Sequence, residues 1–162
     1  MNYQAANGRW VVWGSLLVSL LFQIMPLPEV VAAWRPNLLL LVLIYWAMAL
    51  PHRYNILTAW LFGVMLDVLL GASLGIRALA FSIVVYVVVI HFQRLRNFPV
   101  WQQSILVFSL VGFQTLVIYV AEFILNDSTF GIHIFYPAVS SLVLWPWVFM
   151  ILRRIRRHKK VR

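Results

Sequence analysis

IRALAFSIVVYVVVIHF occupies residues 76–92 and is followed by the polar stretch QRLRN at residues 93–97. The first stretch is almost uniformly apolar, and its length approaches the roughly 20 residues with which a helix crosses about 30 Å of hydrocarbon. It shows no alternation of apolar and polar residues, which disfavours a strand of an outer-membrane barrel. We therefore predict a membrane-spanning helix over 76–92 that ends at a base-rich loop.

Five further apolar stretches resemble this one, separated by short polar or Pro/Gly-containing segments. They lie at residues 10–25, 37–50, 56–70, 100–125 and 132–152. The chain is 64% apolar and 10% charged, whereas soluble domains are about 45–50% apolar and about a quarter charged. We predict an all-α integral membrane protein with six transmembrane helices in one bundle over residues 1–152. A soluble all-α core is the less favoured alternative, and the short stretch 37–50 is a candidate for partial burial among the other helices.

The charged residues divide between the two sides that six helices would create. The formal net charge is +9, from 13 Lys and Arg against 4 Asp and Glu. All the bases except Arg35 and Arg77 fall on the side that holds the N-terminus, the second and fourth loops and the C-terminal tail, whereas all the acids fall toward the other side. The positive-inside rule therefore predicts that both termini are cytoplasmic.

The bases are densest in the C-terminal tail, residues 153–162. Each base that lies near an anionic membrane surface contributes about 1 kcal/mol to lipid attraction. We therefore interpret the tail as an orientation signal and an anionic-lipid anchor, with docking to an acidic cytoplasmic partner as the alternative. Nucleic acid is not expected, because no folded basic domain presents these residues. The tail residues concerned are Arg153, Arg154, Arg156, Arg157, Lys159 and Lys160.

Asp67 is the most informative single residue, because it lies within an apolar stretch. Ala59, Gly63, Asp67 and Gly71 are spaced by four and so share one helix face. Small residues allow another helix to approach closely, and a carboxylate in hydrocarbon requires a partner.

We predict a structural polar cluster in the outer half of the protein, in which Arg77 is the nearest partner for Asp67 in sequence and Arg35 the second. Glu122 is a further member that could pair with either arginine or lie at an interface. The alternatives are a proton or ion relay and an anchor for a partner helix.

The sequence offers no recognisable catalytic or metal-binding pattern. It contains no cysteine, which excludes thiolate metal ligands and a cysteine nucleophile. Its histidines share no metal-ligand spacing, and neither a P-loop nor a dinucleotide fingerprint is present. We therefore predict a protein that is not an enzyme, with no catalytic residues, no metal and no cofactor.

Several short stretches carry a further signal through their order and spacing. They lie at residues 8–13, 23–26, 35–37, 45–46, 49–53, 66–67, 71–80, 101–103, 121–123 and 144–147. Taken together, these stretches resemble the enterobacterial-type form of the MreD family of rod shape-determining proteins. The resemblance implies an inner-membrane protein of the cell-elongation machinery that works beside MreC, MreB, the glycosyltransferase RodA and its partner transpeptidase in side-wall peptidoglycan synthesis. It also implies a fold like that of the substrate-binding subunits of energy-coupling-factor transporters.

From the residues and the resemblance together we expect a scaffold that maintains rod shape. The face formed by Ala59, Gly63, Leu70 and Gly71 is expected to receive the transmembrane helix of MreC. The alternative is a small-molecule or lipid-precursor binding or transport protein, which an outward-opening cavity near Asp67 and Arg77 would favour.

Overall fold

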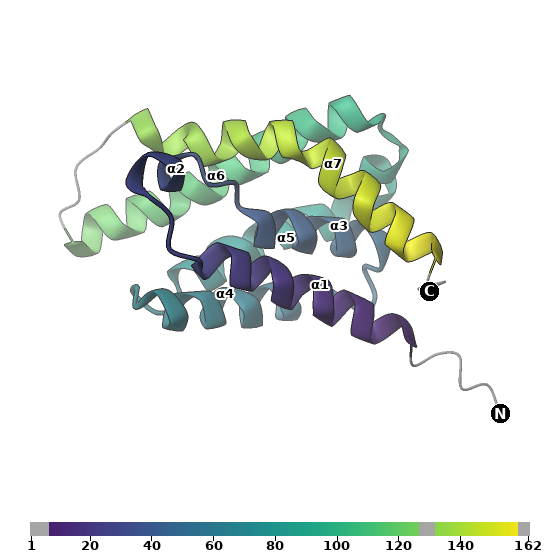
Figure 1. The fold of residues 1–162 in the computed structure, drawn as a ribbon, viewed down its shortest axis with the longest axis horizontal. Coiled ribbons are helices and arrows are strands. Elements are labelled where there is room, and N and C mark those ends of the chain that lie inside the picture. Colours follow the sequence, from purple (N-terminus) through teal and green to yellow (C-terminus); the bar gives the residue numbers. More distant parts are fainter. Residues whose placement is uncertain (1–6, 127–131, 159–162) are drawn as a thin grey trace.

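The computed structural model describes residues 7–126 and 132–158, and all regular elements in these ranges are helices. The helices are α1 (Asn7–Ile24), α2 (Glu29–Ala33), α3 (Leu38–Ala49), α4 (Ile56–Leu70), α5 (Ile76–Asn97), α6 (Val100–Asn126) and α7 (Tyr136–His158), with a 3₁₀ helix at Ile132–Phe135 before α7. This arrangement confirms the predicted all-α class for the described part of the chain. Helix α1 begins and helix α7 ends at the same end of the molecule, on the right in Figure 1.

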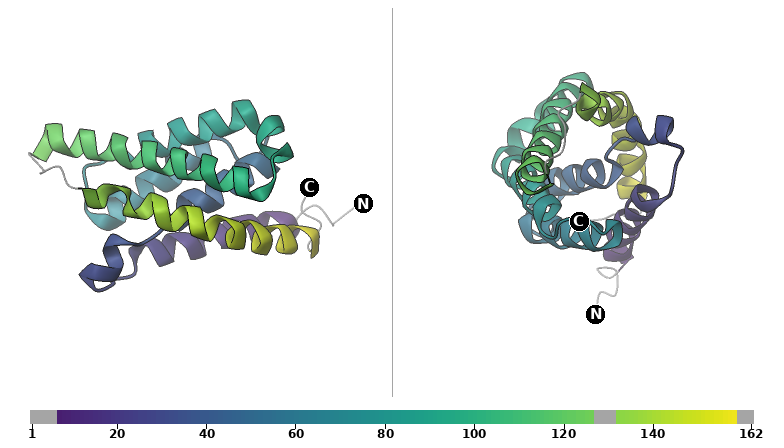
Figure 2. Two further views of the ribbon diagram at one scale, coloured as in Figure 1. Left: turned by 90° about the horizontal axis from the view of Figure 1, so that it is seen from above. Right: turned by 90° about the vertical axis from the view of Figure 1, so that its left-hand side faces the viewer.

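Helix α3 forms the centre of the molecule. Ten of its 12 residues are buried, and it packs against α1, α5 and α7. Figure 2 shows it enclosed by the longer helices when the molecule is viewed along its length. A helix that is apolar on all sides is stable only when it is covered on all sides. Its 12 residues rise about 18 Å, which is less than the hydrocarbon thickness. Helix α3 alone is therefore too short to span a membrane, and its apolar side chains are covered by the neighbouring helices.

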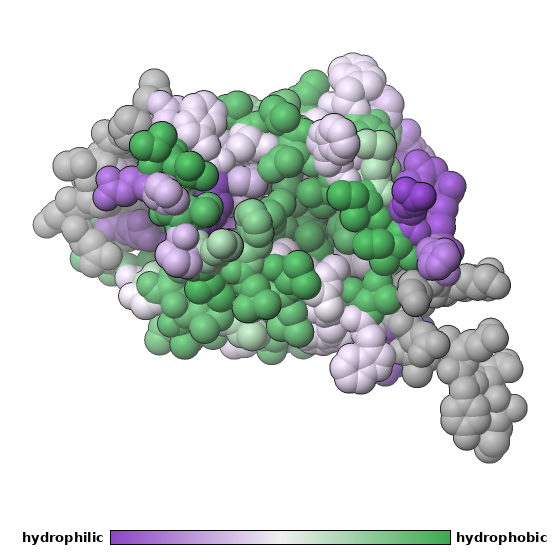
Figure 3. All heavy atoms as spheres, viewed as in Figure 1, coloured by the Kyte–Doolittle hydropathy of each residue, from purple (hydrophilic) through white to green (hydrophobic). Residues whose placement is uncertain are grey.

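The surface of the protein is apolar in the middle and polar at its ends. Figure 3 shows apolar side chains across the central part of one face and hydrophilic side chains toward both ends. Within the described ranges, four segments are long and apolar enough to cross a membrane: Glu29–Ala49, Ile76–Asn97, Val100–Leu125 and Tyr136–His158. Two further apolar helices, Arg9–Ile24 and Ile56–Leu70, are shorter. These are the properties of a multi-pass membrane protein.

Three elements depart from the predicted ranges by more than a few residues. The segment before the second apolar stretch, predicted as a loop, contains α2, which follows Pro28 and begins with Glu29. The fixed φ of proline and an acidic residue in the first turn both favour a helix start there, and Pro36 disfavours helical backbone at Arg35.

Helices α5 and α7 are the other two departures. Helix α5 continues to Asn97 instead of ending at residue 92, so the predicted base-rich loop 93–97 forms its last turns. Helix α7 continues to His158 instead of ending at residue 152. Arginine is a good helix former, so the first part of the predicted tail prolongs the last helix. Lys159 and Lys160 lie outside the described residues.

Candidate functional site

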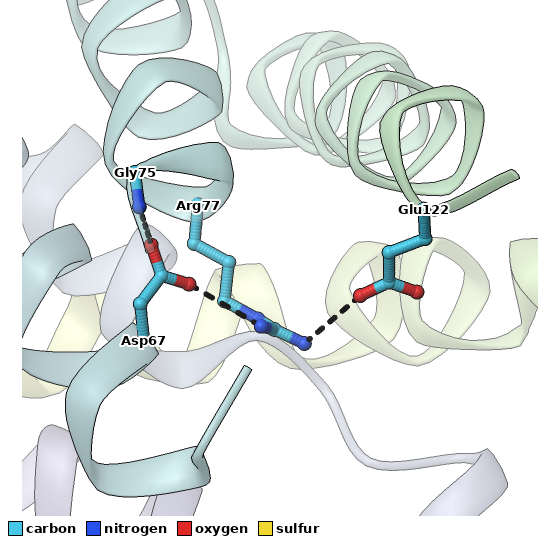
Figure 4. Close-up of polar contacts among 4 residues, drawn as sticks. All are labelled: Asp67, Gly75, Arg77 and Glu122. Atoms are coloured by element: carbon cyan, nitrogen blue, oxygen red, sulfur yellow. Dashed lines mark hydrogen bonds and ion pairs between the residues drawn. The ribbon is translucent and has the colours of Figure 1, made fainter. Parts of the chain in front are cut away.

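Asp67 lies in the last turn of α4 and is completely buried, with 0% of its surface exposed. Its Oδ2 accepts a hydrogen bond of 2.9 Å from the backbone N–H of Gly75, so the turn that joins α4 to α5 folds back over the carboxylate (Figure 4). Gly71 and Gly75 have φ angles of 62° and 92°, a backbone region that glycine enters without steric cost. The two glycines therefore allow the turn that covers Asp67.

Arg77 bridges two carboxylates that belong to different helices. Its Nη1 lies 3.3 Å from Oδ1 of Asp67, and its Nη2 lies 3.7 Å from Oε1 of Glu122. Figure 4 shows the guanidinium between the two acids. The side chains of Arg77 and Glu122 are 21% and 32% exposed. The cluster links the end of α4, the start of α5 and the C-terminal part of α6 by polar contacts.

The two ion pairs contribute differently to the stability of the fold because they are buried to different extents. Removing one member of a buried pair leaves an uncompensated charge and costs about 3–5 kcal/mol, whereas a solvent-exposed pair contributes about 0–1 kcal/mol. Asp67 belongs to the first class, since water does not reach it. Glu122 is closer to the second class, and its contact with Arg77 orients the guanidinium more than it stabilises the fold.

Arg35, the fourth member of the predicted cluster, lies elsewhere. Its Nη1 donates to the carbonyl oxygen of Gln23 at 2.5 Å, and its Nη2 donates to the carbonyl oxygen of Met25. Helix α1 ends at Ile24, and the last carbonyls of a helix lack intrahelical partners. A guanidinium satisfies such carbonyls at a helix C-terminus, so Arg35 fastens the end of α1 to the segment after α2 and is not part of the Asp67 cluster.

The predicted partner-helix face needs a correction. Ala59 is fully buried, and a Cβ added to Gly63 would lie 2.4 Å from Cα of Ala78 and 2.8 Å from its backbone nitrogen. The small residues of α4 therefore serve the close approach of α5 in the same chain, and this part of the face is not open to MreC. Leu70 is 43% exposed and Gly71 is exposed as well, but both lie at the end of α4.

A second cluster of buried polar side chains joins three helices. Asn37 donates from Nδ2 to Oε1 of Gln114 at 3.0 Å, and its backbone N–H donates to Oγ of Ser141 at 3.3 Å. All three residues are buried. The sequence alone did not identify these three residues as a group. Asn37 opens the central helix by accepting from the backbone N–H of Leu40, and this capping pattern is the signal that could have singled it out.

The polar contacts of the Asp67 cluster are made within the chain. The members of the Asp67 cluster hold one another, and the carboxylate faces a backbone donor and a guanidinium. Among the residues that the structure describes, no group of three or more histidine or acidic side chains could hold a metal ion. The four tail arginines lie in the last turns of α7.

The chain is similar to known proteins along nearly its whole length. A family model described as rod shape-determining protein MreD matches residues 4–155. A rod shape-determining protein MreD from Haemophilus influenzae is 35% identical over 145 residues, which are 90% of this chain and 90% of that protein. No solved structure matches, so the likeness to the substrate-binding subunits of energy-coupling-factor transporters stays a prediction. The match of the family model, from before the first helix to the last turns of α7, shows that this chain belongs to the MreD family of rod shape-determining proteins.

Proposed function

We propose that this protein is an inner-membrane scaffold of the cell-elongation complex, which links MreC and MreB to side-wall peptidoglycan synthesis by RodA and its partner transpeptidase. The observation that carries the proposal is the family match, which extends from before α1 to residue 155 in α7. The family is described by a role in cell shape and by no reaction. A role beside other membrane proteins requires a stable membrane unit with exposed apolar surface.

The packing supports a scaffold better than a carrier. A carrier with a site beside Asp67 would need access to that side chain, whereas Asp67 has no exposed surface. The polar cluster at Arg77 stabilises the positions of α4, α5 and α6. We propose that the six longer helices act as one transmembrane unit, and that the Asp67 cluster preserves its shape at the outer end.

The charge distribution supports an orientation with both ends in the cytoplasm. Helix α7 ends in Arg153, Arg154, Arg156 and Arg157 at the end of the molecule where α1 begins. Bases near the ends of membrane helices are retained on the cytoplasmic side. In this orientation the Asp67 cluster lies toward the periplasm, and the arginines of α7 lie at the level of anionic headgroups.

The link to MreC can be tested by cysteine crosslinking in membranes. The chain contains no native cysteine, so a disulfide to this chain can form only at the introduced cysteine. Single cysteines replace the exposed Trp60, Val68 and Leu70 of α4, and a cysteine at the fully buried Ala59 is the matched control on the same helix. Each is combined with single cysteines along the transmembrane helix of MreC. The same scan is extended to exposed residues of α1, α6 and α7. The scaffold proposal predicts a disulfide between the MreC helix and at least one of these exposed apolar helix faces. No crosslink from any of these faces, in membranes that contain both proteins, would contradict the proposed link.

A further inference from the structure

A pocket of about 640 Å³ opens at the end of the molecule opposite the Asp67 cluster. It lies where α3 ends, α5 turns into α6 and the last turns of α7 pass by (Figure 1). Four arginines line it: Arg96 from α5 and Arg153, Arg156 and Arg157 from α7. Met48, Phe98 and Phe149 belong to the apolar part of the lining. The pocket therefore combines a cationic part with an apolar part.

A buried polar side chain connects the helices that form the walls of the pocket. Gln103 lines it and is only 3% exposed. Its Nε2 donates to the carbonyl oxygens of Leu95 at 3.0 Å and Phe98 at 3.1 Å, and its Oε1 accepts from Nε1 of Trp145 at 3.4 Å. These bonds fix the turn between α5 and α6 against α7. Arg96 and the arginines of α7 are thus held around one space by the fold.

Among the described residues, no carboxylate balances the positive charge of the pocket. No carboxylate lines it, and within the described ranges both ion pairs involve Arg77. Glu29, Asp67 and Glu122 belong to helix segments near the other end of the molecule.

Two of the pocket arginines lie next to aromatic residues of the lining. The guanidinium of Arg153 lies 5.9 Å from the ring centroid of Phe149, and Arg156 lies beside the hydroxyl of Tyr45. Guanidinium groups present planar pairs of donors that match the oxygens of a phosphate.

We propose that this pocket binds the phosphate headgroup of an anionic phospholipid, with the first part of the acyl chains against the apolar lining. A lipid headgroup and free phosphate share the same chemistry here, because guanidinium groups would bind a pair of phosphate oxygens in either ligand. The apolar lining and the position at the edge of the apolar surface favour a lipid over free phosphate, and exposed Trp101 beside the pocket is typical of headgroup level. Basic pockets between membrane helices are suited to such headgroups. The proposal requires only that the chain lies in a membrane, so it can fail while the proposed function stands.

The test compares two double variants that remove the same charge from the same two helices. Arg96→Gln with Arg156→Gln removes two pocket residues, whereas Arg94→Gln with Arg154→Gln removes two arginines that do not line this pocket. Purified full-length proteins in phosphatidylcholine nanodiscs are titrated with phosphatidylglycerol, and retained lipid is counted by native mass spectrometry. Both variants lose the general attraction of two surface bases, about fivefold each, and the pocket variant also loses two charge-assisted hydrogen bonds to the phosphate, about tenfold each. The pocket variant should therefore bind about 100-fold more weakly than the control variant.

Three outcomes would overturn the proposal. Equal weakening in both variants would show a diffuse charge effect and no discrete site. Binding of inorganic phosphate as tight as that of phosphatidylglycerol would show that the ligand is not a lipid. A photoreactive phosphatidylglycerol analogue on the unaltered chain keeps the test independent of variant folding. Labelling of residues 96–103 or 149–157 supports the pocket, and labelling confined to other segments contradicts it.

Discussion

Replacing Gly63 by alanine should destabilise the protein through a single steric contact between α4 and α5. The added Cβ would lie 2.4 Å from Cα of Ala78, 2.8 Å from its nitrogen and 3.1 Å from the carbonyl carbon of Arg77. Carbon atoms in ordinary contact lie about 3.5–4.0 Å apart. The two helices must therefore separate locally by about 1 Å, because the obstructing atoms belong to the backbone and cannot rotate away.

The magnitude follows from two opposing contributions. Overpacking costs about 1–3 kcal/mol, and a rigid backbone neighbour places Gly63→Ala toward the upper end of that range. Alanine in place of a helical glycine returns about 1 kcal/mol. We expect a net loss of about 2 kcal/mol in the free energy of unfolding, together with a weakened contact between Arg77 and Asp67, since Arg77 must move with its carbonyl carbon.

Gly14→Ala is the matched control, because Gly14 is also within a helix and nothing lies within 4 Å of an added Cβ. Its free energy of unfolding should be unchanged or higher by up to about 1 kcal/mol, so the two variants should differ by about 2–3 kcal/mol. Reversible unfolding in mixed micelles, followed by far-ultraviolet circular dichroism, measures this difference. Adding Ala78→Gly should not restore stability, because the clash involves backbone atoms. Equal stability of the Gly63 and Gly14 variants, or full rescue by Ala78→Gly, would refute the packing argument.

Three further predictions concern the buried polar groups, each measured by the same unfolding assay. Asp67→Ala should lower the free energy of unfolding by about 3–5 kcal/mol, because Arg77 and the Gly75 N–H lose a buried acceptor; a loss below about 1 kcal/mol would show that water replaces the carboxylate. Glu122→Gln should change it by less than about 1 kcal/mol, because that contact is longer and partly exposed, and a larger loss would mean that Glu122 is essential to the cluster. Gln114→Leu should cost about 1–3 kcal/mol by leaving the amide of Asn37 unsatisfied, whereas a neutral outcome would indicate that Asn37 finds another acceptor.

The positions of the main helices follow from the sequence because apolar stretches and breaks are local properties. The range 56–70 agrees with α4, where Asn55 accepts from the Leu57 N–H at the start and Gly71 adopts the left-handed conformation at the end. The end of α7 could not be placed by apolarity, since its last turns are formed by arginines that are polar but helix-forming. Helix α2 is only five residues long, too short to leave a periodic pattern.

The candidate site was predictable where partners are close in the chain and unpredictable where they are not. Asp67 and Arg77 flank one turn, so their pairing follows once that turn is recognised. Arg35 had both acidic side chains and helix-end carbonyls as possible acceptors, and only the spatial position of Gln23 decides between them. The small face of α4 indicates a close helix contact, but the pattern does not identify which helix makes it, and the neighbour supplied by the same chain occupies it.

The basic residues show the same division between local and spatial information. Their accumulation at one end of the protein is visible in the sequence. Their separation into arginines that line the pocket and arginines that do not depends on how α5 and α7 pack, because Arg94 and Arg96 are only two residues apart. Gln103, which fixes that packing, carries no sequence signal that distinguishes it from an ordinary interfacial glutamine.

The most direct test of the proposed role is complementation of cell shape. A rod-shaped bacterium whose own MreD is depleted becomes the host for this chain, for the Asp67→Ala variant and for the Gly14→Ala control, each quantified in the membrane fraction. Cell length-to-width ratio is then measured by microscopy during growth. We predict that the unaltered chain and the Gly14 control restore rods and that Asp67→Ala does not. Spherical cells despite normal membrane levels of the unaltered chain would contradict the assignment of this protein to rod shape determination.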